Sequence, residues 1–200
     1  DFIVSKTDKS GRITYANRIF MEIAGYPEHE LLGVQHNIIR HPDMPRGVFR
    51  FMWDTLKAGD EFFGFAKNLC ADGGFYWVFA NITPDYDKDG KLQGYYSVRR
   101  NPPRSALEAI TPIYNEMLAI EKNSSVKEAP LRSLDYLFDA VKHAGAKSYN
   151  NLVLQLYKPN GVLKRWTSSN RILRKSIPVS VRPAKAITTA MQWETAYPAC

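Results

Sequence analysis

The sequence is poor in cysteine and has no long apolar segment. Its two cysteines, Cys70 and Cys200, are too few and too far apart to form a disulfide framework or a cysteine-based zinc site. No run of about 18 apolar residues predicts a transmembrane helix, and no secretory leader pattern is present. These absences favour a reducing, cytoplasmic setting. The chain starts at Asp1 within a predicted strand, which suggests a fragment of a longer protein.

Acidic residues are scarce only in the C-terminal segment, residues 158–200. Lysine and arginine together number 27 against 20 aspartates and glutamates, so the formal net charge is +7. Residues 158–200 contain eight of the bases and one of the acids, which leaves the rest of the chain electrically neutral. Neither a recognition helix nor an aromatic platform accompanies these bases. We therefore expect residues 158–200 to be a solvated tail without a packed domain, and we expect no nucleic-acid partner.

Motifs for catalysis and for metal binding are also lacking. No serine or cysteine stands in a nucleophile-elbow motif and no carboxylate pair stands out, so an enzyme is not expected. The segment HNIIRHPDMP at residues 36–45 is rich in polar side chains, but its two histidines lack helical i, i+4 spacing and a third partner. A metal site is therefore disfavoured. This segment is either a ligand-binding loop or a solvated polar loop whose Asp43 caps the next helix.

Short apolar runs with glycine-containing turns predict a mixed fold. Five strands are expected, at residues 2–8, 11–17, 61–71, 75–87 and 91–101. Helical spacing predicts three helices between them, at residues 18–24, 27–33 and 45–59. This order favours an α+β domain in which short helices cover one face of a five-stranded antiparallel sheet. A ligand pocket is expected between the two layers.

Amphipathic helices are predicted after the proline pair at 102–103. Residues 104–121 have apolar positions three and four apart, Leu107 and Ile110 among them. A helix that leaves the sheet with such a stripe is expected to carry an output. The expected organisation is a domain at 1–101, a flanking output helix at 102–123, a further helical segment at 131–157 and the basic tail at 158–200.

Several motifs together resemble a PAS sensor domain. ITYANRIFMEIAGYPEHELLG at 13–33 resembles the opening of PAS domains in general. HNIIRHPDMPRGVFRFMWDTLKAGDEF, followed by KNLCADGGFYWVFANITP and GKLQGYYSVRR, is similar to the PAS domain of aerotaxis and energy-taxis receptors, which holds FAD. The resemblance covers about residues 1–121. It implies the PAS fold, noncovalent FAD, sensing of redox or oxygen status, a homodimer formed through the sheet or flanking helices, and a downstream signalling domain or chemotaxis machinery.

The resemblance also implies a set of cofactor-binding residues. Arg40, His41 and Asp43 match loop positions that the family needs for FAD binding, and an arginine beside a histidine suits a pyrophosphate. Asn68 and Asn81 match strand positions from which a carboxamide can offer a donor and an acceptor to the isoalloxazine edge. We expect Asp43 to brace Arg40 or to cap the helix that follows.

Three aromatic residues complete this set. Trp53 and Trp77 match the helix and strand tryptophans of the family, and each is either a flavin contact or a core residue. Phe62 stands where the aerotaxis receptors carry tryptophan, so ring stacking is kept and an indole N–H contact is lost. This departure weakens the case for FAD specifically, and leaves a PAS domain with a pocket unaffected.

Two alternatives to FAD follow from the same resemblance. The first is a haem b sensor in which His36 or His41 is the axial ligand. The second is a cofactor-free PAS module that dimerises. Blue-light adduct chemistry is disfavoured because it needs a cysteine on the helix over the flavin, whereas Cys70 falls on a predicted strand.

Overall fold

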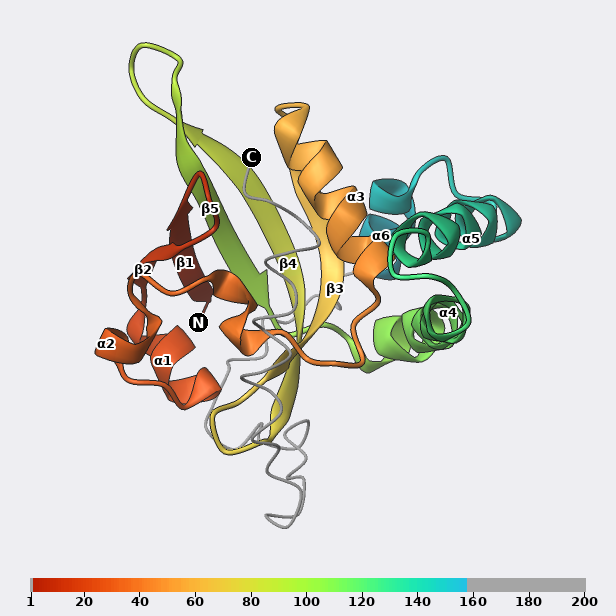
Figure 1. Cartoon of the computed structure of the whole chain (residues 1–200), viewed down its shortest axis with the longest axis horizontal. Coiled ribbons are helices and arrows are strands. Elements are labelled where there is room, and N and C mark those ends of the chain that lie inside the picture. Colours follow the sequence, from red (N-terminus) through yellow and green to blue (C-terminus); the bar gives the residue numbers. More distant parts are fainter. Residues whose placement is uncertain (1, 158–200) are drawn as a thin grey trace.

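One antiparallel sheet of five strands organises the chain (Figure 1). The computed structural model describes residues 2–157, so the expected basic tail at 158–200 lies outside the described residues. The strands are β1 (Ile3–Asp8), β2 (Ile13–Ala16), β3 (Phe62–Leu69), β4 (Phe75–Tyr86) and β5 (Leu92–Arg100). Their order across the sheet is β2-β1-β5-β4-β3, and all neighbours are antiparallel. The predicted five-stranded antiparallel sheet is confirmed, and β5 is the central strand.

Short helices cover one face of this sheet. They are α1 (Arg18–Ala24), α2 (Glu28–Leu31), the 3-10 helix η1 (His36–Ile39) and α3 (Arg46–Lys57). The Asn17 side chain accepts a hydrogen bond from the Phe20 N–H at the start of α1, and Gly25 ends this helix with a positive φ of 76°. The sequence predicts a loop at 36–45, whereas its first part forms η1. The reason is that this tight turn buries Ile39 in the apolar layer.

The alternation of side chains gives the sheet two distinct faces. We call inner the face toward α1, α2 and η1, where Ile3, Ala80 and Arg99 are cross-strand neighbours. We call outer the opposite face, which carries Trp77 and Phe79. A residue on β4 therefore belongs to the inner face when its number is even and to the outer face when its number is odd.

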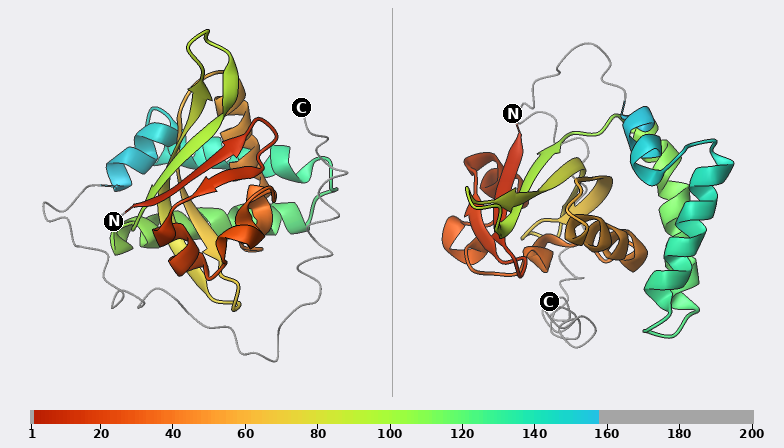
Figure 2. Two further views of the ribbon diagram at one scale, coloured as in Figure 1. Left: turned by 90° about the vertical axis from the view of Figure 1, so that its left-hand side faces the viewer. Right: turned by 90° about the horizontal axis from the view of Figure 1, so that it is seen from above.

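Three C-terminal helices gather beside α3 and β3 (Figures 1 and 2). They are α4 (Arg104–Lys122), α5 (Ala129–His143) and α6 (Tyr149–Leu156). α4 continues through Pro112, which lies inside the helix. Ile110 and Met117 on α4 are fully buried, so the chain's own helices cover much of the stripe that was expected to serve an output. In the part of the chain that is described, no helix is long and apolar enough to cross a membrane.

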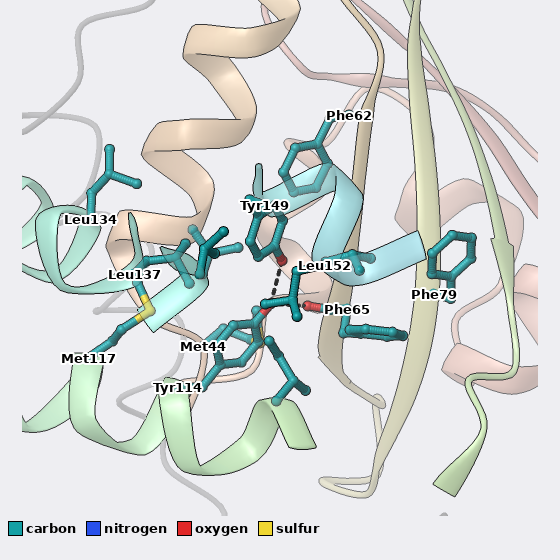
Figure 3. Packing of buried hydrophobic residues seen from close by; sticks show 14 of the residues in the cluster. Met44, Phe62, Phe65, Phe79, Tyr114, Met117, Leu134, Leu137, Tyr149 and Leu152 are labelled. Atoms are coloured by element: carbon teal, nitrogen blue, oxygen red, sulfur yellow. Dashed lines mark hydrogen bonds between the residues drawn. The ribbon is translucent and has the colours of Figure 1, made fainter. Parts of the chain in front are cut away.

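A buried hydrogen-bond chain joins these helices to the edge strand. The Tyr114 hydroxyl donates to the Phe65 carbonyl at 2.9 Å, and the Tyr149 hydroxyl lies 2.8 Å from that of Tyr114 (Figure 3). Because the Tyr114 proton is used on Phe65, Tyr149 is the donor to Tyr114. We call the apolar residues around this pair the helical cluster, and they include Met44, Val48, Phe62, Phe65, Ile110, Met117, Leu134, Leu137 and Leu152.

A carboxylate from α4 caps the first turn of α3. The Glu121 side chain accepts from the Arg46 N–H at 3.0 Å and from the Gly47 N–H at 2.9 Å. The Ser133 hydroxyl of α5 donates to the same carboxylate at 2.7 Å. α5 comes so close that a Cβ atom at Gly47 would collide with the Ser133 hydroxyl. Backbone amides and a negative charge thus fix α4 and α5 to the start of α3.

Candidate functional site

A group of polar side chains lies within the apolar layer of the inner face. It consists of Ser5 on β1, His36 on η1, Tyr76 on β4 and Arg99 on β5, and we call it the inner polar cluster. Ser5 is fully buried, and Tyr76 and Arg99 are 4% and 2% exposed. The surrounding residues are apolar side chains of the sheet, α1, α2 and η1. Because buried polar groups in proteins are normally hydrogen-bonded, the partners of these groups decide what they do.

Arg99 is a buried cation with few partners. Its Nη2 donates to the Ser5 hydroxyl, and its guanidinium carbon lies 4.5 Å from the centroid of the Phe20 ring. Within residues 2–157, its Nε and Nη1 atoms have no hydrogen-bond partner. Burial lowers the pKa of Arg99 to about 10, so the side chain keeps its charge at neutral pH. Three N–H groups on these two nitrogens are therefore left without an acceptor.

His36 is the neutral end of the same hydrogen-bond chain. Its Nε2 lies 3.2 Å from the Ser5 hydroxyl, and its ring stacks on Phe20 with centroids 5.8 Å apart. Burial and the nearby Arg99 charge lower the pKa of His36 to about 3. The Ser5 oxygen accepts from Arg99 and keeps one proton and a second lone pair, so the direction of the Ser5–His36 hydrogen bond depends on the imidazole tautomer.

Tyr76 adds a second buried group without a partner. Its hydroxyl makes no hydrogen bond of good geometry among the described residues, and the Asn68 carboxamide lies near enough to act on its pKa. Burial raises the pKa of Tyr76, so the hydroxyl stays protonated and can donate. Asn68 is 7% exposed and pairs with Tyr76 across β3 and β4, which puts its carboxamide on the inner face as well. The inner face thus offers guanidinium, hydroxyl and carboxamide groups within one apolar layer.

Side chains fill the space between the inner face and its helices. Phe20, Leu31 and Ile39 are buried there, so the expected pocket is closed over the inner polar cluster. A shallow hollow lies instead on the outer face, between Lys6, Tyr15 and Tyr96.

The predicted loop residues Arg40, His41 and Asp43 lie along the edge of the sheet. Arg40 forms an isolated β-bridge with Asn68, and its guanidinium donates to the Met44 carbonyl at 3.2 Å and covers the Phe49 ring at 4.1 Å. The Asp43 carboxylate lies 2.5 Å from Lys67 Nζ. Asp43 therefore pairs with Lys67, and the cap of α3 carries no hydrogen bond from its side chain.

His41 is buried at this edge and holds one unpartnered N–H. Its Nδ1 accepts from the Asp43 N–H at 3.1 Å, so Nε2 carries the proton, and Nε2 has no partner among the described residues. Its ring meets the Phe75 ring edge-on at 5.5 Å. Burial and the Lys67 charge lower the pKa of His41 to about 4, although Asp43 acts in the opposite direction. The imidazole is therefore neutral at neutral pH.

The structure separates the two predicted asparagines. Asn81 is on the outer face and donates to Glu61 Oε2 at 3.1 Å, whereas Asn68 is on the inner face. Trp77 also points outward and stacks on Tyr114 of α4 with centroids 6.3 Å apart. Strand alternation is the cause, because odd and even positions of β4 face opposite ways.

The other two predicted aromatic residues make contacts within the protein. Trp53 on α3 meets Tyr95 of β5 edge-on at 5.3 Å. Phe62 stacks on Tyr149 of α6 at 6.0 Å and belongs to the helical cluster. Of the eight predicted site residues, Asn68 is the one that the sheet places beside Tyr76 of the inner polar cluster.

Sequence reasoning missed Ser5, Tyr76 and Arg99 as functional candidates. A signal for Arg99 was present, because Arg99 and Arg100 are consecutive in a strand and must point to opposite faces. Since β5 is central in the sheet, one of these arginines has to enter the covered side. Ser5 and Tyr76 gave no comparable signal, because a single serine or tyrosine is ordinary in a strand.

Comparison with known proteins shows which proteins the chain is similar to. A family model described as the PAS fold matches residues 13–99. The aerotaxis receptor of Escherichia coli is 41% identical over 117 residues, which cover 58% of this chain and 23% of the receptor. The nitrogen fixation regulatory protein of Klebsiella pneumoniae is 34% identical over 98 residues, 49% of this chain and 20% of that protein. The chain thus spans less than a quarter of the length of these relatives.

A match to part of this chain is also found among solved structures. The PAS domain of a protein from Colwellia psychrerythraea is 20% identical, with a TM-score of 0.43, and the match covers 50% of this chain and 85% of that chain. The range matched by the family model runs from β2 into β5 and contains Asn68, Tyr76 and Arg99. The sheet and the helices on its inner face agree with the fold expected from the sequence. The match to the PAS-fold model over residues 13–99 and the five-stranded antiparallel sheet agree with the PAS fold, and the sequence over this range is similar to that of the aerotaxis receptor.

Proposed function

We propose that the chain is a PAS sensory domain that binds a flavin, FAD, noncovalently against the inner face and responds to its redox state. One observation carries this proposal: Arg99 is buried, charged and has unpartnered N–H groups on the inner face. A buried charge without a partner is costly to the fold, so a ligand that accepts from it explains its presence. The similarity to the aerotaxis receptor supports the choice of a sensory role.

The chemistry of the inner face suits a flavin ring. An isoalloxazine presents carbonyl oxygens and ring nitrogens along one edge and apolar faces above and below. Arg99 and Tyr76 offer donors to such an edge, and the Asn68 carboxamide offers both a donor and an acceptor. Phe20 and Ile39 offer apolar contacts for the ring faces. When bound, the flavin supplies the redox chemistry, while these residues bind it, orient it and exclude water.

In this proposal the loop residues serve the phosphate end of FAD. Arg40 and His41 lie at the edge of β3, next to Asn68, where a chain leaving the inner face would emerge. Arg40 would have to exchange its contact with the Met44 carbonyl for a phosphate oxygen. Asp43 would hold Lys67 through its carboxylate and His41 through its backbone N–H. The proposal gives no flavin contact to the other predicted site residues, which make only contacts within the protein. They are Trp53, Phe62, Trp77 and Asn81.

Two asparagines provide a matched test of this site. Asn68→Ala removes a carboxamide from the inner face, and Asn81→Ala removes the same group from the outer face of the neighbouring strand. Isothermal titration with FAD and with FMN should show an affinity loss on the order of tenfold to a hundredfold for Asn68→Ala, because hydrogen bonds to the ring are lost. Asn81→Ala should bind as the parent chain does.

The absorption spectrum of the freshly purified protein shows which cofactor, if any, is bound. Flavin bands in the blue region, with FAD released on heating, support the proposal. An intense Soret band would establish haem as the bound group and contradict the choice of flavin. A colourless protein that binds neither FAD nor FMN would remove the proposed function. Self-association and a downstream signalling partner stay predictions, which sedimentation and co-purification with a chemotaxis adaptor would test.

A further inference from the structure

The inner polar cluster contains a positive charge and no negative one. Among residues 2–157, no carboxylate pairs with Arg99, and its neighbours Ser5, His36 and Tyr76 are neutral at neutral pH. His36 cannot compensate the charge, since protonation would add a second positive charge beside Arg99. Tyr76 cannot do so either, since burial opposes its ionisation. The positive charge of Arg99 therefore has no counter-charge among the described residues, and an anionic ligand could provide one.

We infer that the inner polar cluster is a binding site for one negative charge, and that Arg99 makes the site prefer the anionic form of its ligand. The inference rests on the proposed function in one respect: for a flavin, the anionic form is the reduced ring. Arg99 would then set the redox potential at which the sensor responds. The class of ligand group is a delocalised ring oxyanion, which accepts from a planar guanidinium through two parallel N–H groups.

The redox step balances without a further protein group. Two electrons from an external reductant and one proton taken from water convert the neutral oxidised ring to a reduced ring with one negative charge. The second proton is not taken up, because Arg99 already provides the positive charge opposite the ring edge. Since attraction between opposite charges is stronger in a buried site than in water, the reduced form gains more from Arg99 than the oxidised form does.

Neighbouring arginines provide the comparison that tests this inference. Arg99→Met removes the buried charge and keeps an unbranched apolar side chain. Arg100→Met removes the same charge from the next residue, which is exposed on the outer face and lies over the Phe2 ring at 4.9 Å. The flavin-loaded chains would be titrated with dithionite against a reference dye. In Arg99→Met, the ratio of reduced to oxidised flavin affinity should fall at least tenfold, which lowers the two-electron potential by about 30 mV.

The controls determine whether charge is the cause. Arg100→Met should leave the potential unchanged, and Arg99→Lys should recover part of the shift, because lysine restores the charge without the planar N–H pair. An unchanged potential in Arg99→Met would overturn the inference, and so would an equal shift in the two methionine variants.

Stability of the ligand-free chain gives a readout that does not depend on flavin. If Arg99 is kept for a ligand, Arg99→Met should unfold at a denaturant concentration equal to or above that of the parent chain, because an uncompensated buried charge has been removed. A lower midpoint in Arg99→Met than in Arg100→Met would assign Arg99 to the fold and overturn the inference. Should the parent chain bind no flavin, the proposed function fails, and this midpoint alone decides whether Arg99 is a ligand group.

Discussion

The molecule buries tyrosine hydroxyls in two regions, and the hydroxyls of the two regions differ in their hydrogen-bond partners. In the helical cluster, Tyr149 donates to Tyr114 and Tyr114 donates to the Phe65 carbonyl, so both protons are used. On the inner face, the Tyr76 hydroxyl and two nitrogens of Arg99 have no partner within residues 2–157. Both regions are closely packed and apolar around these groups. The two regions thus differ in hydrogen-bond satisfaction, and they are alike in burial.

This difference separates groups that hold the fold from groups that serve a ligand. A satisfied buried hydroxyl contributes about 1 kcal/mol to the free energy of unfolding, whereas an unsatisfied one costs about 1–3 kcal/mol. An unsatisfied group that is nevertheless present is therefore a candidate for function. By this criterion the helical cluster is structural, and the inner polar cluster is the candidate site.

The largest effect is expected from the helical cluster. Leu137 on α5 is fully buried, and Leu137→Ala should lower the free energy of unfolding by about 2–5 kcal/mol, because it removes apolar contacts and leaves a cavity. Denaturant unfolding measures this. Leu131→Ala on the same helix, where the side chain is 48% exposed, is the control and should change little. Equal effects of the two would mean that α5 is not packed as described.

Paired tyrosine variants test the comparison directly. Tyr114→Phe should lower the free energy of unfolding by about 1–3 kcal/mol, because it leaves the Phe65 carbonyl and the Tyr149 hydroxyl without partners. Tyr76→Phe should leave it unchanged or raise it, because the removed hydroxyl has no partner. Thermal and denaturant unfolding of the ligand-free chain measure both. A larger loss in Tyr76→Phe than in Tyr114→Phe would reverse the assignment of the two regions.

Acid should weaken the fold through His36 and His41, whose pKa values the fold lowers. The pKa of His36 is lowered to about 3 by burial and Arg99, and that of His41 to about 4 by burial and Lys67. Because both values lie below that of an unfolded histidine, the stabilisation is complete above pH 6.5 and is lost as the pH falls toward 4. Between pH 7 and pH 5, His41 alone should account for about 1–2 kcal/mol of this loss.

Substitution of each histidine checks the source of the acid effect. His41→Gln and His36→Gln should each flatten the dependence of unfolding free energy on pH between 7 and 5. His143→Gln is the matched control, because this histidine is exposed at the end of α5. A parent chain whose stability does not change over this interval would show that neither imidazole is kept neutral by the fold.

The smallest effect is expected at the contact between α3 and α4. Glu121→Gln keeps the side-chain shape but removes the charge and one acceptor from the first turn of α3, so the free energy of unfolding should fall by about 0.5–1.5 kcal/mol. Glu116→Gln, at an exposed position of the same helix, should have no measurable effect. Similar values for the two variants would show that the cap on α3 is not stabilising.

Local patterns were enough to predict the fold from the sequence. Alternating strands, glycine turns and helical spacing act over a few residues, and the PAS motifs tie these elements into one order. The position of the predicted loop residues followed from the same motifs, and the structure does place Arg40 beside Asn68 at the edge of β3. Whether this edge holds the phosphates of FAD stays a prediction.

The inner polar cluster could not be predicted in the same way, because it depends on contacts between distant segments. Ser5 and Arg99 meet because β1 and β5 pair in one particular register, and a shift by one residue would exchange Arg99 for Arg100. For the same reason Asn81 was expected beside Asn68 and lies on the other face. The docking of α4 onto α3 through Glu121 likewise joins residues that no local pattern connects.

Glu121 also determines how motion can pass between the two halves of the molecule. Its carboxylate accepts from two successive amides of α3 and from one hydroxyl of α5 at once, so a displacement of α4 strains all three bonds together. Hydrogen bonds of this kind weaken steeply with distance and angle. A movement of α4 is therefore felt by α3 and α5 at the same time, through a single carboxylate.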